Sequence, residues 1–336
     1  MEKIKQLRKL FKREKIDGYL IPKNDEFFGE YIPDYNDRLN FISRFKGSYG
    51  FALVLKKKNY LFVDGRYTLQ AHNQSGKYFK IITIPNKMPY SILKNKKLSI
   101  GFDAKLFTKK TLNVFFRESN YKLKPIKQNL IDKIWIRKIK LNKKKFYKLP
   151  NHSVSESFKS KINKIVAYIK KSSAEFLFVT ASENNAWLLN MRGRDTEYTP
   201  IPNSYILIDK NKNIRFFCDL KKIPSSLKTY FKPIQFIKIN AVDKCLLNIK
   251  GKKFIIDKNT CSQYFENIIS KKNKILNYQD PLYLYKAIKG TKEINNIKKA
   301  HIQDGAALTK YLFWVKKNFC KKKITEISAS KKLLEF

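Results

Sequence analysis

Only a few side chains near the C-terminal end are of types that could do acid–base or metal chemistry. They are Glu293, His301, Asp304, Glu326 and Glu335. His301 and Asp304 stand three residues apart, so they would share one face of a helix and could touch. Two side chains do not form a metal or catalytic centre, and common active-site motifs such as His-Glu-x-x-His and Gly-x-Ser-x-Gly are absent from the sequence. We therefore expect a structural pairing of His301 with Asp304, and we assign no catalytic and no metal-binding residue.

Arg66 is the first of three residues that could line a cleft or an interface. It lies in the run Asp64-Gly65-Arg66-Tyr67, directly after an apolar hairpin. Asp64 could cap the helix that follows, while Arg66 pairs with a carboxylate and holds the hairpin. Alternatively, Arg66 could reach an active site across a subunit interface. The residues alone leave both interpretations open.

Arg192 and Asp195 are the other two candidates. They stand three residues apart in the run Arg192-Gly193-Arg194-Asp195, and this spacing would let them brace a tight loop. Alternatively, Arg192 could face a cleft or a contact between subunits. Both interpretations remain open at this stage.

The elements that must position these residues occur twice in the same order. Each series begins with an amphipathic helix and a buried strand and continues to a hairpin of two apolar strands. The first series lies at 4–16, 19–21 and 51–63, and the second at 158–171, 175–180 and 204–219. Strands that alternate with helices are typical of α/β domains, so we predict a duplicated α/β domain.

Two further segments have simpler interpretations. We interpret residues 129–157 as the connection between the domains, and the lysine-rich run at 140–148 within it as a solvated segment. Near the C-terminus, apolar residues recur every three or four positions, which predicts a helix that begins at Thr291 and ends near Asn318. Thr291 is expected to cap this helix, and a second helix is expected to begin at Thr325.

The composition indicates a folded protein with a basic surface. The chain has 336 residues, of which 43% are hydrophobic, and a formal net charge of +45. Only 10 of the 72 basic residues are arginine, whereas sequence-specific contacts to nucleic acid favour clustered arginine, so nucleic acid is not the expected partner. The four cysteines show no Cys-x-x-Cys spacing and are expected to be buried thiols. The sequence has no signal-like or membrane-spanning segment, which predicts a cytoplasmic protein that does not enter a membrane.

Several runs of residues resemble one family of metallopeptidases. The first half matches it at Asp17 to Pro22, Glu30 to Ile32, Phe45 to Gly50 and Asp64 to Tyr67; the second half at Trp187 to Asp195, with Tyr198 and Pro200; and the C-terminal part at Ala300 to Ala307. In this order and spacing they are similar to the Xaa-Pro aminopeptidases (aminopeptidase P), specifically to the three-domain form. Prolidases and creatinases differ, since they carry one domain before the metal domain.

The resemblance implies two creatinase-type N-terminal α/β domains, each a mixed sheet with flanking helices, at 1–150 and 151–281. Residues 282–336 would be the first helices of a pita-bread (α+β) catalytic domain that this chain contains only in part. Enzymes of the family release the N-terminal residue that precedes proline. They use two divalent ions, usually manganese, and they are typically homodimers or larger.

The metal ligands of the family would follow the last residue of this chain, so we expect no metal on the chain and no activity from it alone. Two other functions stay open: a non-catalytic interaction or oligomerisation module, and a polyanion-binding protein that acts through its lysines.

Overall fold

The computed structural model describes residues 2–93, 97–117, 121–137, 142–321 and 323–336. The chain divides into two compact units. One combines residues 1–148 with 158–283 and holds both large sheets, and the other combines residues 149–157 with 284–336. In the first unit, we call the first sheet with its helices domain I and the second sheet with its helices domain II.

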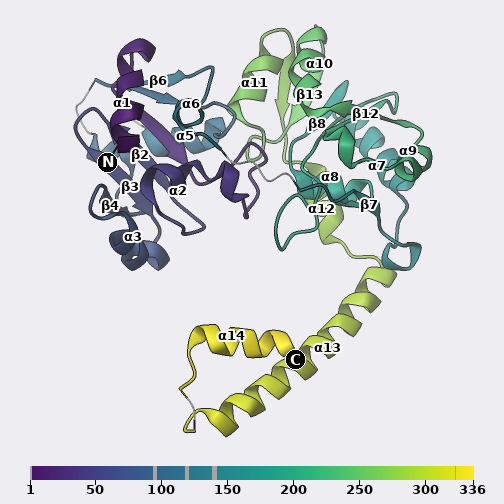
Figure 1. Ribbon diagram of the computed structural model, residues 1–336. Helices are drawn as coiled ribbons and strands as arrows, with labels where there is room; N and C mark the ends of the chain where they lie inside the picture. Colours follow the sequence, from purple (N-terminus) through teal and green to yellow (C-terminus); the bar gives the residue numbers. More distant parts are fainter. Residues whose placement is uncertain (1, 94–96, 118–120, 138–141, 322) are drawn as a thin grey trace. The chain divides into compact units, whose positions relative to one another are not determined.

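Domain I is built on a six-stranded mixed sheet with the strand order β4-β3-β2-β1-β5-β6 (Figure 1). The strands β1, β2 and β3 pair antiparallel, whereas β5 and β6 continue from β1 in parallel and β4 runs parallel to β3. The bounds are β1 (Gly18–Pro22), β2 (Phe51–Leu55), β3 (Asn59–Val63), β4 (Lys80–Thr83), β5 (Ser99–Phe102) and β6 (Lys122–Pro125). The predicted hairpin at 51–63 is therefore confirmed.

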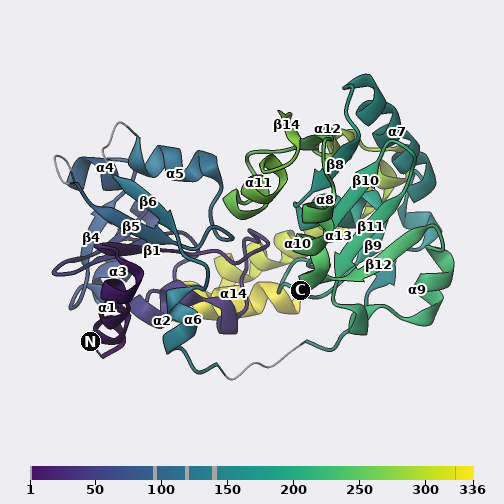
Figure 2. The same ribbon diagram turned by 90° about the horizontal axis from the view of Figure 1, so that it is seen from above.

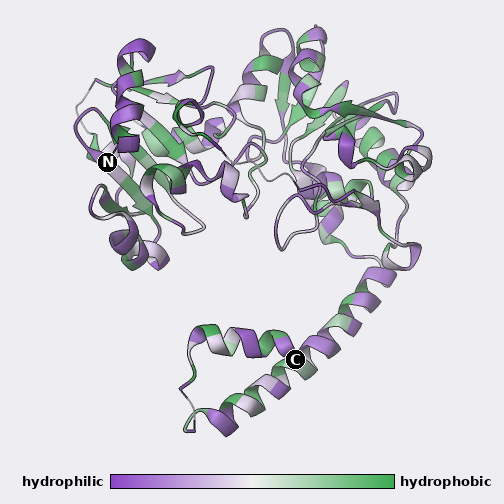
Figure 3. Ribbon diagram, viewed as in Figure 1, coloured by the Kyte–Doolittle hydropathy of each residue, from purple (hydrophilic) through white to green (hydrophobic). Residues whose placement is uncertain are grey.

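Helices cover both faces of this sheet, as Figure 2 shows. They are α1 (Glu2–Glu14), α2 (Arg38–Ser43), α3 (Thr68–Ser75), α4 (Pro89–Ile92), α5 (Lys109–Phe116) and α6 (Leu130–Ile134). Alternate strand residues point to opposite faces: Tyr19 and Ile21 pack with α1, α2 and α6, whereas Leu20 packs with α5. Because both faces are buried at the middle of the sheet, the central strand β2 is apolar along its whole length (Figure 3).

Domain II repeats this plan. Its strand order, β12-β11-β10-β8-β13-β14, has the same sequence of antiparallel and parallel neighbours. The bounds are β8 (Phe176–Val179), β10 (Tyr205–Asp209), β11 (Ile214–Cys218), β12 (Ile234–Lys238), β13 (Lys253–Ile256) and β14 (Lys274–Asn277). The predicted duplication is confirmed.

The helices of domain II also correspond in place to those of domain I. They are α7 (Phe158–Lys171), α8 (Ser182–Leu188), α9 (Ser225–Tyr230), α10 (Val242–Asn248) and α11 (Gln263–Ser270), and α12 (Pro281–Ala287) follows β14. Single 3₁₀ turns are η1 (Asp34–Asn36), η2 (Gly65–Tyr67), η3 (Asn151–Ser153), η4 (Leu220–Lys222) and η5 (Ile239–Ala241).

The interpretation of residues 129–157 as a plain connection was wrong in two places. Leu130 and Ile131 of α6 are fully buried in domain I, and the amide of Leu130 donates to the hydroxyl of Tyr19 over 3.2 Å. Further on, β7 (Tyr147–Lys148) pairs antiparallel with β9 (Met191–Arg192). Both elements are short and flanked by polar residues, so neither produces a clear pattern of apolar residues in the sequence. Residues 138–141 of the lysine-rich run lie outside the described residues.

The second unit contains α13 (Thr291–Asn318) and α14 (Glu326–Glu335), at the predicted positions. The cap of α13 differs from the prediction, since Gly290 and not Thr291 is the N-cap residue. The carboxylate of Glu293 accepts from the Gly290 amide over 2.8 Å, and the amide of Glu293 donates to the Ser155 hydroxyl over 3.3 Å. These contacts hold residues 151–155 against the first turn of α13.

The cysteines are free thiols, as expected, but they are not all buried. Cys218 and Cys261 are buried, whereas Cys320 is exposed. Among the described residues, no helix combines the length and the apolarity that crossing a membrane would need.

Candidate functional site

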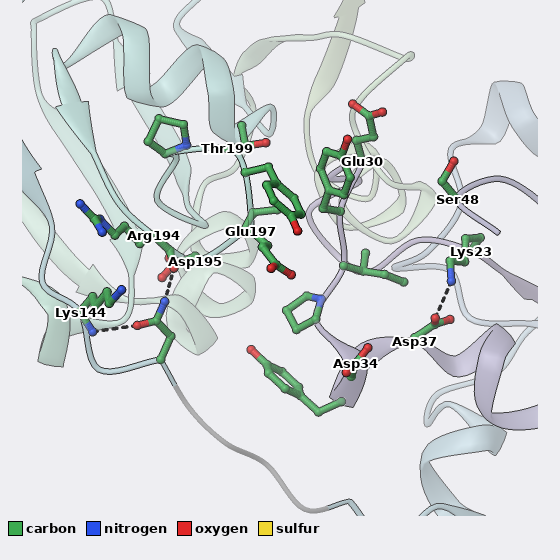
Figure 4. A pocket seen from close by; sticks show the side chains of 18 of the residues that line it. Lys23, Glu30, Asp34, Asp37, Ser48, Lys144, Arg194, Asp195, Glu197 and Thr199 are labelled. Carbon is green, nitrogen blue, oxygen red and sulfur yellow. Dashed lines mark hydrogen bonds and ion pairs between the residues drawn. The ribbon is translucent and has the colours of Figure 1, made fainter. Parts of the chain in front are cut away.

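The sheet-bearing unit contains a cleft of about 1100 Å³ between loops of domain I and domain II. Domain I contributes the segment 30–37, between β1 and α2, and domain II contributes the loop 194–200 between β9 and β10. In Figure 4, Asp34, Asp37 and Lys23 lie on one side of the cleft, and Arg194, Asp195 and Glu197 lie on the other. These two loops are more than 150 residues apart in the sequence.

The charge of the cleft differs from that of the chain. Of the nine charged residues that line it, five are acidic: Glu30, Asp34, Asp37, Asp195 and Glu197. In the whole chain, by contrast, acidic residues are only 27 against 72 basic ones. The balanced charge suits a ligand that carries both signs, and it disfavours a polyanion in this place.

On the domain II side, Asp195 lines the cleft and is tied down by three contacts. Its carboxylate forms an ion pair with Lys222 and accepts from the amide of Asn203 over 2.8 Å. Its own amide donates to the carbonyl of Ile201 over 3.4 Å. Asp195 thus fastens both ends of the loop 194–203.

Arg192 lies outside the lining of the cleft. It is half-buried in β9, and one guanidinium nitrogen donates to the carbonyls of Ala186 and Met191, both over 3.0 Å. These contacts join β9 to the end of α8. Arg192 and Asp195, which the sequence analysis considered together, therefore contact different residues.

Arg66 lies in domain I at the mouth of a second, smaller cavity. Its guanidinium pairs with Asp64 over 2.7 Å, and the Asp64 side chain also accepts from the Arg66 amide, which caps η2. The hydrogen bond with Arg66 lowers the pKa of Asp64. Because the Arg66 side chain is 73% exposed, this ion pair is worth little stability.

On the domain I side, buried charged residues lie at and behind the cleft, and the sequence analysis did not identify them as a group. Lys23 pairs with Asp37 over 2.5 Å, and that aspartate also caps α2. Behind the cleft, burial is the largest cause that raises the pKa of Asp25 to about 6, and the charge of Glu26 adds to it. Burial, followed by the charges of Asp195 and Asp25, raises the pKa of Tyr35 at the cleft surface. Five acidic residues between 25 and 37 in so basic a chain were the available signal for this segment.

The predicted pair of His301 and Asp304 is not formed. Both side chains are exposed on α13, and no hydrogen bond or ion pair joins them in the described part of the chain. Within the same described residues, no three or more His, Cys, Asp or Glu side chains gather where they could hold a metal ion. The cleft therefore offers fixed charges suited to binding a ligand.

Comparison with known proteins identifies the architecture. The description "Creatinase/Prolidase N-terminal domain" matches residues 3–134 and, in a second variant of the family, residues 137–293. The chain belongs to this family. The two matched segments correspond to the two creatinase/prolidase N-terminal domains seen in the structure, so the resemblance noted from the sequence is confirmed.

The relatives of this creatinase/prolidase chain are named as Xaa-Pro aminopeptidases. The chain is 29% identical to the probable Xaa-Pro aminopeptidase P of Coprinopsis cinerea, over 92% of this chain and 54% of that protein. It is also 29% identical to Xaa-Pro aminopeptidase 1 of Dictyostelium discoideum, over 100% of this chain and 57% of that protein. The chain thus spans about half the length of the curated relatives it matches.

A solved structure shows the same fold. The X-prolyl aminopeptidase of Caenorhabditis elegans, described as a cytosolic enzyme with a di-nuclear active site, matches with a TM-score of 0.89. The match covers 99% of this chain and 58% of that one, at 24% identity.

Proposed function

We propose that this chain forms the substrate-admitting front part of an Xaa-Pro aminopeptidase. Such an enzyme releases the N-terminal residue that precedes proline. The observation that carries the proposal is the continuous similarity of nearly the whole chain to enzymes of that name, through both domains. The cleft between the two domains, with its balanced charge, is suited to a peptide, which carries charges of both signs.

The described residues do not provide a site for the two divalent ions that the family implies. Such a site needs several carboxylate and imidazole ligands around each ion, and the described residues gather no such group. The ions, manganese in our proposal, and the bond cleavage belong to the part of the relatives that this chain does not match.

A chimeric enzyme tests the proposal. The chain is joined to the part of the Dictyostelium discoideum enzyme that lies beyond the matched region, and release of the first residue from an Xaa-Pro peptide is measured with Mn²⁺. We expect metal-dependent release by the chimera and none by the chain alone. Release by the chain alone would contradict the assignment of chemistry, and a folded, metal-loaded but inactive chimera would contradict the assignment to this enzyme class.

We further propose a homodimer in the cytoplasm, by analogy with the family and with the cytosolic C. elegans protein. Light scattering coupled to gel filtration measures the mass directly. A mass near twice 39.8 kDa supports the dimer, and a mass near 39.8 kDa at all concentrations contradicts it.

A non-catalytic interaction module is the second candidate, and one observation favours it. No residue of α13 or α14 is buried, although these helices carry large apolar side chains such as Ile302, Phe313 and Leu334. An inactive chimera together with a stable complex formed through these helices would favour this function.

A further inference from the structure

Domain I contains a cavity of about 390 Å³ that borders its core. It lies beyond the carboxyl ends of β1 and β5, which are parallel neighbours in the middle of the sheet. After β1 the chain continues to β2 on one side, and after β5 it continues to β6 on the other side. The crevice between two such diverging connections is where open α/β sheets bind ligands.

The cavity is apolar inside and polar at its mouth. The rings of Phe51, Phe107 and Phe115 form its floor and are at most 6% exposed. Phe51 stacks on Phe115 with 4.1 Å between ring centroids. Glu30 and Arg66 stand exposed at the mouth. An apolar pocket with a few polar groups at its edge is the usual form of a small-ligand site.

In domain II, an aromatic side chain fills the space that corresponds to this cavity. Thr111 and Phe265 correspond, because each follows its helix cap, Thr108 or Ser262, by three residues and donates its amide to that cap. In domain II the Phe265 ring packs against Tyr205 with centroids 5.0 Å apart, and Phe27 stacks on the same tyrosine at 5.3 Å. In domain I, Thr111 is too small to occupy this space. The ring that occupies this position in domain II is therefore missing from domain I.

The backbone at the cavity wall is also unusual. Phe28 lines the cavity with a φ of +55°, in the left-handed region that residues with a Cβ seldom adopt. Backbone strain of this kind persists where the surrounding structure holds it, and it concentrates at ligand sites.

We propose that this cavity binds one large apolar side chain, phenylalanine or leucine, of a peptide that lies along the neighbouring cleft. The cavity and the cleft share Lys23, Glu30 and Ser48, so they adjoin each other. The apolar floor fits the side chain, and the charged cleft fits the peptide backbone and termini. The choice of a peptide rests on the proposed function, whereas the apolar pocket stands on the geometry alone.

The test uses the full chain and measures binding without hydrolysis. N-acetyl-phenylalaninamide, N-acetyl-alaninamide and benzyl alcohol are titrated by ligand-observed NMR. We expect the phenylalanine probe to bind at least tenfold more tightly than the other two. Equal binding of the alanine probe would overturn the pocket, and equal binding of benzyl alcohol would overturn the peptide as its ligand.

Variants on one helix locate the binding. Thr111→Phe places the ring of domain II into the cavity, and Thr111→Leu is a smaller replacement should the first variant not fold. Both are expected to weaken binding of the phenylalanine probe at least tenfold. Val114→Phe adds a ring to the exposed side of the same helix and should leave binding unchanged. Unchanged binding by a folded Thr111 variant would overturn the assignment. These outcomes do not depend on the activity of the chimera.

Discussion

At the scale of single residues, buried charges that join distant segments are the most consequential feature. Arg38 is 3% exposed and forms a double hydrogen bond with Asp132, at 2.8 and 3.0 Å, and a third bond with Glu26 at 2.7 Å. The hydrogen bonds and charges of these two carboxylates outweigh burial and raise the pKa of Arg38. One guanidinium nitrogen of Arg38 has no partner in the described structure. This residue joins α2 to α6 on the face of domain I that also carries α1.

Replacing Arg38 with alanine should therefore destabilise the protein strongly. The change removes a buried guanidinium, leaves Glu26 without its cation and leaves Asp132 paired with Arg137 alone, at a cost of about 3 kcal/mol. Urea unfolding measures the change. Arg13→Ala is the matched control, since the Arg13 side chain is 62% exposed, and a change below about 0.5 kcal/mol is expected for it. Similar losses for the two variants would contradict the role of Arg38.

Asp25 should make the stability depend on pH. Its pKa is about 6 in the folded protein and 3.8 ordinarily, so between about pH 4 and 6 the folded state keeps a proton that the unfolded state has lost. Folding stability must then fall as pH rises through this window, by about 3 kcal/mol from this residue. Asp25→Asn removes this contribution. Unfolding at pH 4 and at pH 6.5 should show the variant gaining stability relative to the natural protein at the higher pH, and a pH-independent difference would contradict the prediction.

At the scale of elements, the start of α13 depends on the absence of a side chain. A Cβ at Gly290 would lie 2.2 Å from the Cβ of Ser155, whereas a Cβ at Gly305, in the middle of the same helix, would meet nothing within 4 Å. The helix cap and the segment that packs on it thus require glycine at one position only.

Two glycine-to-alanine changes on this helix should have opposite effects. Gly290→Ala should cost about 1–3 kcal/mol, because the segment 151–155 must move away from the cap. Gly305→Ala should stabilise the helix by about 1 kcal/mol, the usual difference between the two residues in a helix interior. Hydrogen exchange of the α13 amides reports both changes, and protection that moves in the same direction for both variants would refute this account of the cap.

At the scale of the whole sheet-bearing unit, several contacts join domain I to domain II. Phe27 leaves domain I and packs against the core of domain II, where its ring stacks on Tyr205. The hydroxyl of Tyr205 donates to the carbonyl of Glu26 over 2.8 Å. The amides of Gln263 and Tyr264 donate to carbonyls of domain I, at Phe107 and Ala104.

Phe27→Ala should weaken the coupling of the two domains. Removing the partly buried Phe27 ring from its place against the domain II core should cost about 2 kcal/mol of folding stability. The two domains should then unfold in two transitions instead of one. Tyr198→Ala is the control, because Tyr198 also meets an aromatic ring across the cleft, that of Tyr31, but is 80% exposed. Calorimetry distinguishes one transition from two. A single transition at an unchanged temperature in Phe27→Ala would contradict this role.

The sequence by itself determined the duplication and the main helices and strands of each domain, though not the short elements α6 and β7. Apolar runs and helical periodicity indicate which side of a local segment is buried. They were sufficient to predict the hairpin at 51–63, the helix 158–171 and the bounds of α13. It was also enough for the family, because the motif residues lie close together along the chain.

Only the tertiary structure decided which distant residues meet. Arg38 and Asp132 are 94 positions apart, and the cleft joins the segment 30–37 to the loop 194–200. The cavity beside Thr111 was recognised only by comparing the two domains, because Phe265 occupies the corresponding position in domain II. The physical reason is that local periodicity carries no information on which loop ends converge at a sheet edge, since strand order and pairing set that convergence.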